Sequence, residues 1–305
     1  PVAAPAAGPN PQHGHTPMPI LPDTYKGIAL ILLATLGIVL MNACAKMSSA
    51  ALTPLEMLFY RGLLALALLT PYMLATHSAA VFKTHRIRAH LYRGIIGNIG
   101  VGCVFWAYTL LPMADATALL FAAPLFVTAL SPILLKETIH GYQWAAVVIG
   151  FGGILLIAKP SPEMLVNPAS LIGLAAAFFI ALVDMALRNL GRTDDPLTTV
   201  FYFLLFGVVI SAPYTLIFGT LPATATVPWI IGIGIFTAIQ QVAKTTAYRF
   251  APASLLAPYT YSSILWATLT RWIFWKDLPT LSVVIGAGVV IACNLAIAWR
   301  ERPVR

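Results

Sequence analysis

Three charged residues stand inside stretches of the chain that are otherwise almost wholly apolar: Arg61, Asp184 and Lys244. A charge at the centre of a membrane-crossing helix costs about 2.5–3.5 kcal/mol, so each of these residues needs a partner or a role. The chemistry open to them is ion pairing, binding of an oppositely charged group or, for Asp184, carriage of a proton. The sequence contains no HExxH, GxSxG or Walker motif. We therefore predict no enzymatic activity, no metal site and no cofactor.

The segments that must position these charges are long apolar runs. Of the 305 residues, 59% are hydrophobic and 9% are charged, whereas soluble domains carry about 25% charged residues. A bilayer-spanning helix needs about 20 apolar residues. The sequence predicts an all-α integral membrane protein with ten transmembrane helices, at about 26–46, 54–75, 92–111, 114–135, 141–158, 170–188, 196–218, 228–249, 253–275 and 281–299.

The chain repeats itself at a spacing of about 140 residues. AYTLLP at 107–112 corresponds to AYRFAP at 247–252, and each is followed 24 residues after its proline by a Lys-acid pair, Lys136-Glu137 and Lys276-Asp277. The predicted halves, 25–159 and 169–300, hold five helices each. Because five is odd, the second half must enter the membrane from the opposite side, which predicts inverted repeats and the geometry of alternating access. Residues 1–24, rich in Pro and Ala, are predicted to be a disordered tail, and 301–305 a cytoplasmic tail.

The distribution of Lys and Arg predicts the orientation. With the N-terminus in the cytoplasm, twelve of the eighteen Lys and Arg residues, Arg93 and Arg188 among them, fall in inside segments and three in outside loops. This excess indicates that both termini are cytoplasmic. The formal net charge of +8 is spread between the predicted helices, so no nucleic-acid partner is expected. The expected partners are the lipid bilayer and a small-molecule substrate, with the protein a monomer or a weak homo-oligomer.

The order and spacing of these features resemble a known family. FYRGLL at 59–64, AYTLLPMADATALLFAAPLF at 107–126 and the acidic pair after the fourth helix are similar to EamA-type members of the drug/metabolite transporter superfamily. Within it the chain resembles the bacterial YddG-like amino-acid exporters and also the S-adenosylmethionine carriers. The resemblance covers about residues 25–300. The family usually has Gly-Glu where this chain has Lys136-Glu137 and Lys276-Asp277.

The resemblance implies a carrier of the bacterial inner membrane whose central cavity is lined by the first four helices of each half, with the fifth and tenth helices as scaffold. Amide and hydroxyl groups beside aromatic rings suit a ligand with a polar head and an apolar body. Interfacial or packing roles remain open for the aromatic residues. The predicted cavity residues are Asn42, Arg61, Asn98, Trp106, Phe121, Gln240, Tyr259, Ser263 and Trp266.

Two further predictions concern motion. Asp184 and Lys244 are expected at similar depth, where they could pair and close the inner side, although Lys244 could also extend to the cytoplasmic surface. Pro124 and Pro258 could kink the fourth and ninth helices. Arg61 has either a structural ion pair with Glu56 or Asp115, or a contact with substrate or gate. For the substrate, export of amino acids, bulky or aromatic ones in particular, competes with exchange or uptake of a cationic metabolite such as S-adenosylmethionine.

Overall fold

The computed structural model describes residues 22–48, 51–76, 79–111, 113–165, 167–219, 222–276 and 281–300, and within these ranges the chain is helical with no strand. Most of the predicted tail at 1–24 and all of 301–305 lie outside the described residues, as does Asp277. Pro22, Asp23 and Thr24, which the sequence places in the tail, form the first turn of helix α1. Proline is compatible with the first turn of a helix because its missing N–H would be unpaired there anyway.

The helices coincide with the predicted apolar segments. In the first half they are α1 (Pro22–Ser48), α2 (Pro54–Thr76), α3 (Ile87–Leu110), α4 (Met113–Leu120), α5 (Ala123–Leu134) and α6 (Gly141–Ala158), with short 3-10 turns η1 (Ala79–Phe82) and η2 (Pro162–Leu165). In the second half they are α7 (Ser170–Leu190), α8 (Pro196–Phe218), α9 (Val227–Phe250), α10 (Ala253–Leu256), η3 (Ala257–Tyr261), α11 (Ser262–Trp275) and α12 (Leu281–Arg300).

Two of the predicted helices are interrupted near their prolines. The segment 114–135 is divided into α4 and α5 by a turn at Phe121 and Ala122, and Pro124 stands in the first turn of α5. The segment 253–275 is divided into α10, the 3-10 turn η3 that contains Pro258, and α11. A proline inside a helix removes one backbone hydrogen bond and clashes with the preceding turn. Both interruptions therefore fall where the sequence makes a continuous helix costly.

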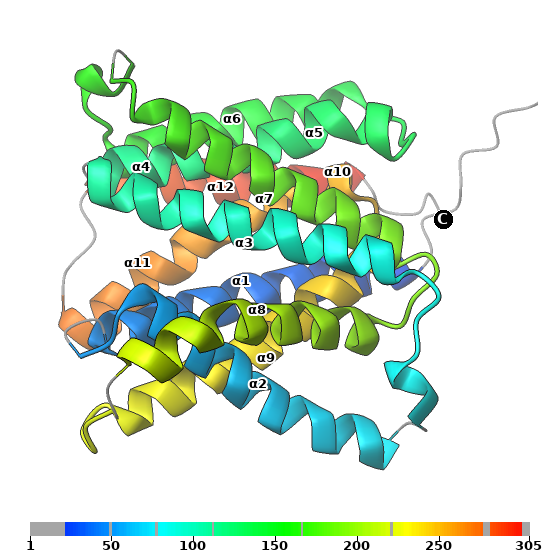
Figure 1. Cartoon of the computed structure of the whole chain (residues 1–305). Helices are drawn as coiled ribbons and strands as arrows, with labels where there is room; N and C mark the ends of the chain where they lie inside the picture. Colours follow the sequence, from blue (N-terminus) through cyan, green and yellow to red (C-terminus); the bar gives the residue numbers. More distant parts are fainter. Residues whose placement is uncertain are drawn as a thin grey trace, which may run out of the picture.

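The helices pack in pairs that join the two halves of the chain. The most extensive contacts are those of α1 with α9, α3 with α7, α2 with α8 and α6 with α12. The start of α1 and the end of α12 lie on the same side of the bundle (Figure 1). Close approach depends on small residues: an added Cβ at Gly234 of α9 would lie 2.4 Å from the Cβ of Leu64 in α2. Small residues allow this kind of tight helix packing in membranes.

The surface of the bundle is apolar. Large hydrophobic side chains are exposed along many helices, such as Leu171 at 69%, Leu216 at 77% and Leu281 at 75%. In the described part of the chain, five helices are long and apolar enough to cross a membrane, within α1, α2, α7, α8 and α9, and shorter apolar helices occur between Ala118 and Leu134, in α6 and in α12. An exposed apolar surface of this extent is stable in lipid rather than in water.

Three helices end in a backbone conformation that favours glycine. Lys159 (φ 48°) and Lys276 (φ 57°) adopt the left-handed conformation directly after α6 and α11. Lys136 (φ 56°) adopts it one residue beyond Leu135, the C-cap of α5. Helices commonly end this way, and glycine usually occupies the position because a Cβ is strained there. Lys136 and Lys276, which stand where the resemblance implies glycine, therefore each have a strained backbone, one in each copy of the repeat.

Candidate functional site

The Asp184 carboxylate and the Lys244 ammonium group form an ion pair in the interior. Asp184 lies on α7 and Lys244 on α9, with Oδ1 and Nζ 2.6 Å apart, and their side chains are 4% and 20% exposed. The hydroxyl of Tyr248, one turn further along α9, is buried near Asp184. The structure thus brings together the two residues that the sequence predicts as a gate. Because desolvation opposes a buried pair, such a pair is weak evidence for stability.

Among the side chains that the structure describes, Arg93 is the largest charged one that is fully buried. The sequence counts it among the residues of the inside segments, at the start of the predicted helix at 92–111, and it lies inside α3 at 1% exposure. Its Nη1 donates to the carbonyl of Thr199 at 3.1 Å and its Nη2 to Oε1 of Gln241 at 3.3 Å. The guanidinium carbon lies 4.2 Å from the ring centroid of Phe203, in the range of a cation–π contact. Arg93 therefore ties α3 to α8 and α9.

A second ion pair closes the end of the bundle where α5 and α7 finish. Arg188 donates from Nε to Oε1 of Glu137 at 3.0 Å and from Nη1 to the carbonyl of Tyr248 at 2.7 Å. Glu137 also accepts from the backbone N–H of Ala253 and of Ser254, both at 3.4 Å, and from the Ser254 hydroxyl at 3.3 Å. A carboxylate at a helix N-terminus satisfies N–H groups that have no partner within the helix. Glu137 thus joins the first half of the chain to α7 and α10.

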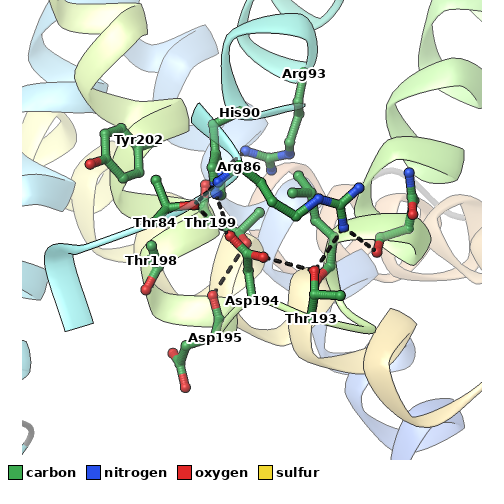
Figure 2. A network of polar contacts seen from close by, with 12 residues as sticks. Thr84, Arg86, His90, Arg93, Thr193, Asp194, Asp195, Thr198, Thr199 and Tyr202 are labelled. Atoms are coloured by element: carbon green, nitrogen blue, oxygen red, sulfur yellow. Dashed lines mark hydrogen bonds and ion pairs between the residues drawn. The ribbon is translucent and has the colours of Figure 1, made fainter. Parts of the chain in front are cut away.

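A third polar cluster surrounds Asp194, in the connection between α7 and α8 (Figure 2). Its Oδ2 accepts from the Thr84 hydroxyl at 2.8 Å and lies 2.8 Å from Nε2 of His90. Its Oδ1 accepts from the Thr193 hydroxyl at 2.8 Å, and that hydroxyl in turn accepts from Arg86 at 2.7 Å. Partial burial alone raises the pKa of the Asp194 carboxyl, but the hydrogen bonds from Thr193, His90 and Thr84 outweigh it and bring that pKa below its usual value.

A narrow pocket lies between α2, α3 and α8, and Arg61 and Asn98 are its polar residues. The Nδ2 group of Asn98 donates to the carbonyl of Gly94 in its own helix at 2.7 Å. Glu56, one predicted partner of Arg61, accepts from the N–H and hydroxyl of Thr53 and so caps α2. The side chain of Asp115, the other predicted partner, lies outside the described residues.

The remaining predicted cavity residues are distributed around the bundle. Tyr259 donates to the carbonyl of Asn294 in α12 at 3.2 Å, and Trp266 donates to the hydroxyl of Thr35 in α1 at 3.2 Å. Ser263 bonds within its own segment, and the ring of Phe121 lies 6.2 Å from that of Tyr261. Asn42 and Trp106 are exposed, and Gln240 is buried against Gly37. Of the predicted cavity residues, the pocket therefore gathers Arg61 and Asn98 but not Tyr259 or Trp266.

The whole bundle matches the sequence model of one protein family. The description of that model is "EamA-like transporter family", and it matches residues 25–159 and 167–298. The chain belongs to the EamA-like transporter family. It is accordingly a multi-pass membrane protein of the drug/metabolite transporter superfamily, and the family and its named relatives are transporters, not enzymes.

Several relatives of this EamA-like transporter align over nearly their full length. The pseudopaline exporter CntI of Pseudomonas aeruginosa is 30% identical over 271 residues, covering 88% of this chain and 94% of the relative. A riboflavin transporter of Vibrio cholerae is 28% identical, with coverage of 90% and 93%. An S-adenosylmethionine uptake transporter of Rickettsia prowazekii is 25% identical, with coverage of 92% and 95%.

A solved crystal structure has the same fold. It superposes with a TM-score of 0.76 at 20% sequence identity, and the match covers 90% of this chain and 96% of the other. At this identity the likeness concerns the arrangement of helices alone. The helical bundle of this EamA-like transporter is thus an arrangement found among experimental structures.

Sequence reasoning missed the polar links that close one end of this transporter. The sequence singled out Glu137 only as part of the repeated Lys-acid pair, and Arg188 only as a basic residue of the inside segments. His90 and Asp194 lie 104 residues apart, and no local pattern connects them. Such contacts depend on how the helices pack, so the amino-acid sequence alone contained no signal for them.

Proposed function

We propose that this chain is a secondary transporter of the bacterial inner membrane that exports amino acids, aromatic ones included, or similar small metabolites by alternating access. In this proposal the ten helical segments cross the membrane as two inverted repeats, 25–159 and 169–300, with both termini in the cytoplasm. The pairing of helices supports it. In the repeat α1 corresponds to α7 and α3 to α9, so exchanging the two halves turns the contact of α1 with α9 into the contact of α7 with α3. The contacts of α2 with α8 and of α6 with α12 are each converted into themselves.

The observation that carries the proposal is a concentration of polar links between helices at one end of the bundle. Glu137–Arg188 and His90–Asp194 each join the first half to the second, and Asp184–Lys244 joins α7 to α9 within the second half. All three lie toward the end where the orientation proposed here places the cytoplasm. The conformation is then closed to the cytoplasm, and breaking these links is the step that opens the inner side.

The interrupted helices supply places where such a movement can occur. The turn at Phe121 and Ala122 separates α4 from α5, and η3 separates α10 from α11. We propose that Pro124 and Pro258 hold these interruptions open, so that one piece of each helix moves while the other stays packed. Discontinuous helices in this position are a recurring feature of secondary transporters.

A second candidate function is uptake or exchange of S-adenosylmethionine or another metabolite. It is favoured by the relatives that are named as S-adenosylmethionine uptake transporters, which align over about nine-tenths of the chain. Export is favoured by the relative of highest identity among those described above, which is named as an exporter. The direction of a secondary transporter follows the gradients acting on it, so the substrate is what distinguishes the two candidates experimentally.

Counterflow in proteoliposomes tests the proposal directly. Vesicles are preloaded with one unlabelled compound, and entry of a labelled amino acid is followed, with phenylalanine, tryptophan, threonine, lysine, glutamate and S-adenosylmethionine as the panel. Accumulation driven by several amino acids and absent from protein-free vesicles supports an amino-acid carrier. A response to S-adenosylmethionine alone supports the second candidate, and no response from folded protein to any member contradicts both.

A further inference from the structure

A groove of about 190 Å³ lies on the outside of the bundle between α3, α5 and α7, and we call it the α7 groove. Its walls include Tyr92 of α3 and Leu134 of α5, which are 51% and 52% exposed, and Leu182 and Ala186 of α7. An engineered cavity of about 150 Å³ in another protein holds a benzene ring. The α7 groove therefore has room for a segment of an acyl chain.

The groove continues into an exposed apolar stripe on α7. Leu171, Phe178, Leu182 and Ala186 follow one another at spacings of seven, four and four residues, which places them on one face of the helix. Leu171 is 69% exposed and Phe178 is 37% exposed. A chain that lies in the groove can thus extend along this stripe toward the middle of the membrane. An apolar groove on the outside of a membrane bundle is a site for lipid.

Two arginines stand on either side of one end of the α7 groove. Nη1 of Arg86 donates to the carbonyl of Asn189 at 3.4 Å and to the hydroxyl of Thr193 at 2.7 Å. Nη2 of Arg192 donates to the carbonyl of Leu135 at 3.4 Å. Asn189 and Leu135 are themselves lining residues of the groove. Figure 2 shows the side chain of Arg86 reaching across to Thr193.

These two guanidinium groups carry charge that no acid balances directly. Neither Arg86 nor Arg192 forms an ion pair with a carboxylate in the part of the chain that the structure describes, because Glu137 and Asp194 have other partners. Each guanidinium has five N–H donors, of which the structure uses one or two. The planar fork of arginine matches the oxygens of a phosphate group. The end of the groove is therefore suited to a phosphate.

The apolar groove and the arginines meet where a phospholipid changes from tail to head group. Here α3 begins and α5 and α7 end, on the right of the bundle in Figure 1. Tyr92 has the amphipathic ring that is common at the membrane–water interface. Basic pockets between helices on the cytoplasmic side of a membrane bind anionic head groups, and an acyl chain adds the burial of its methylene groups.

We propose that the α7 groove binds one anionic phospholipid, with its phosphate on Arg86 and Arg192 and one acyl chain between α3, α5 and α7. This inference goes beyond the proposed transport function, and only the assignment to the cytoplasmic leaflet rests on the orientation proposed above. Leu135 directly follows α5, and Asn189 belongs to the last turn of α7. The lipid therefore contacts the ends of the helices that Glu137 and Arg188 join, and its binding stabilises the folded protein.

The experiment uses purified full-length protein in detergent. Native mass spectrometry counts the bound lipids and the copies of the chain, and the unfolding temperature is measured on the same samples. The probes are dioleoylphosphatidylglycerol, which is anionic, dioleoylphosphatidylcholine, which has the same chains and no net charge, and glycerol phosphate, which has the phosphate without the chains.

Three variants locate the site. Arg86→Gln with Arg192→Gln removes both guanidinium groups, and Ala186→Trp fills the groove without changing the charge. The matched control is Lys83→Gln with Arg249→Gln, which neutralises two exposed cations, one shortly before α3 and one near the end of α9. Both double variants remove the same amount of charge from this end of the bundle, so general attraction of anionic lipid affects them equally.

The wild type is expected to bind phosphatidylglycerol more tightly than phosphatidylcholine and to unfold at a higher temperature with it. Arg86→Gln with Arg192→Gln is expected to weaken binding of phosphatidylglycerol about thirtyfold, from the usual contribution of two basic residues at an anionic surface. The control pair is expected to lose little, and Ala186→Trp is expected to lose the bound lipid. Glycerol phosphate is expected not to displace it.

Several results would overturn the lipid site. These are equal affinity of the wild type for the two lipids, an equal loss in the two double variants, and unchanged binding in a folded Ala186→Trp. Displacement of the lipid by glycerol phosphate would assign the arginines to a free phosphate. Dimers that carry no lipid and dissociate in Ala186→Trp would assign the groove to a second copy of the chain.

The binding experiment is independent of transport. If Ala186→Trp does not fold, the comparison of the two double variants decides between a defined site and general charge. Selective binding that depends on Arg86 and Arg192 supports the lipid site even where counterflow of every tested compound fails. Counterflow in a protein that does not select the anionic lipid supports transport and overturns the site.

Discussion

Glu137 and Arg188 meet at 3.0 Å where the first half of the chain touches the second. Their side chains are 7% and 16% exposed, and the same carboxylate accepts from the N–H groups that begin α10. One acid therefore holds the end of α5, the end of α7 and the start of α10 at a single point. In the proposed orientation this point is the cytoplasmic end of the transporter.

Glu137→Gln is expected to weaken the contacts that hold the ends of α5 and α7 and the start of α10 together. Breaking a buried pair by removing one partner costs about 3–5 kcal/mol, because the other charge is left uncompensated. Ser254→Cys, in a background without the three native cysteines, reports the opening through its labelling rate with a membrane-impermeant thiol reagent in inside-out vesicles. Labelling is expected to be several-fold faster with Glu137→Gln and unchanged with Glu163→Gln, which alters an exposed acid. An unchanged rate in Glu137→Gln contradicts the role of this pair in closure.

Neutralising either Asp184 or Lys244 is expected to abolish most counterflow, since each single change leaves one buried charge alone. Exchanging the two charges in Asp184→Lys with Lys244→Asp restores the pair and is expected to restore a substantial part of the rate. Initial rates in proteoliposomes, normalised to the amount of inserted protein, provide the measurement. If the double exchange is folded and as inactive as the single variants, the two residues do not act as a direct pair in transport.

Lys136→Gly and Lys276→Gly are expected to stabilise the protein. Both lysines adopt positive φ after a helix, and a residue with a Cβ pays about 1–2 kcal/mol in the left-handed conformation. Part of this gain is lost to the greater freedom of glycine in the unfolded chain, so each change should raise the unfolding temperature slightly. Lys136→Ala is the matched control because it removes the charge but keeps the Cβ. An equal rise with alanine would mean that charge, and not backbone strain, is responsible.

Asp194 makes the stability of the connection between α7 and α8 depend on pH. Its pKa is below the usual value in the folded protein because Thr193, His90 and Thr84 donate toward it despite its partial burial. A lowered folded pKa gives stability that is fully present above the unfolded value of about 3.9 and is lost as the pH falls through the folded value. Asp194→Asn is therefore expected to lower the unfolding temperature at pH 7.

The difference between the wild type and Asp194→Asn is expected to begin to shrink below about pH 4, where the carboxyl of the unfolded chain becomes protonated. It shrinks further as the pH falls through the lower pKa of the folded protein. The comparison uses the unfolding temperatures of the two detergent-solubilised proteins, measured at about ten pH values between about 3.5 and 8. Asp23→Asn, which removes an exposed acid paired within its own helix, should show a far smaller effect at pH 7. A difference that persists unchanged at the lowest pH would assign the contribution of Asp194 to packing and not to its charge.

The amino-acid sequence by itself determined the helical segments and the membrane environment. Both follow from local properties, since an apolar run of sufficient length forms a helix that satisfies its own backbone in lipid. The interruptions near Pro124 and Pro258 also lie where local chemistry predicts them, because proline removes a backbone hydrogen bond wherever it occurs. Asp184 and Lys244 were paired correctly from their expected depth alone.

Apart from Asp184 and Lys244, only the tertiary structure decided which charges meet. In the sequence Arg93 is a basic residue at the start of the predicted helix at 92–111, and no local pattern there predicts that it is fully buried against Phe203 and Gln241. The partners of Glu137 and Asp194 lie 51 and about a hundred residues away in the chain. Rotation of each helix about its axis sets these contacts, and that rotation is fixed by packing against several neighbours at once. A local pattern carries no information about it, because the energy that decides it is shared among helices distant in sequence.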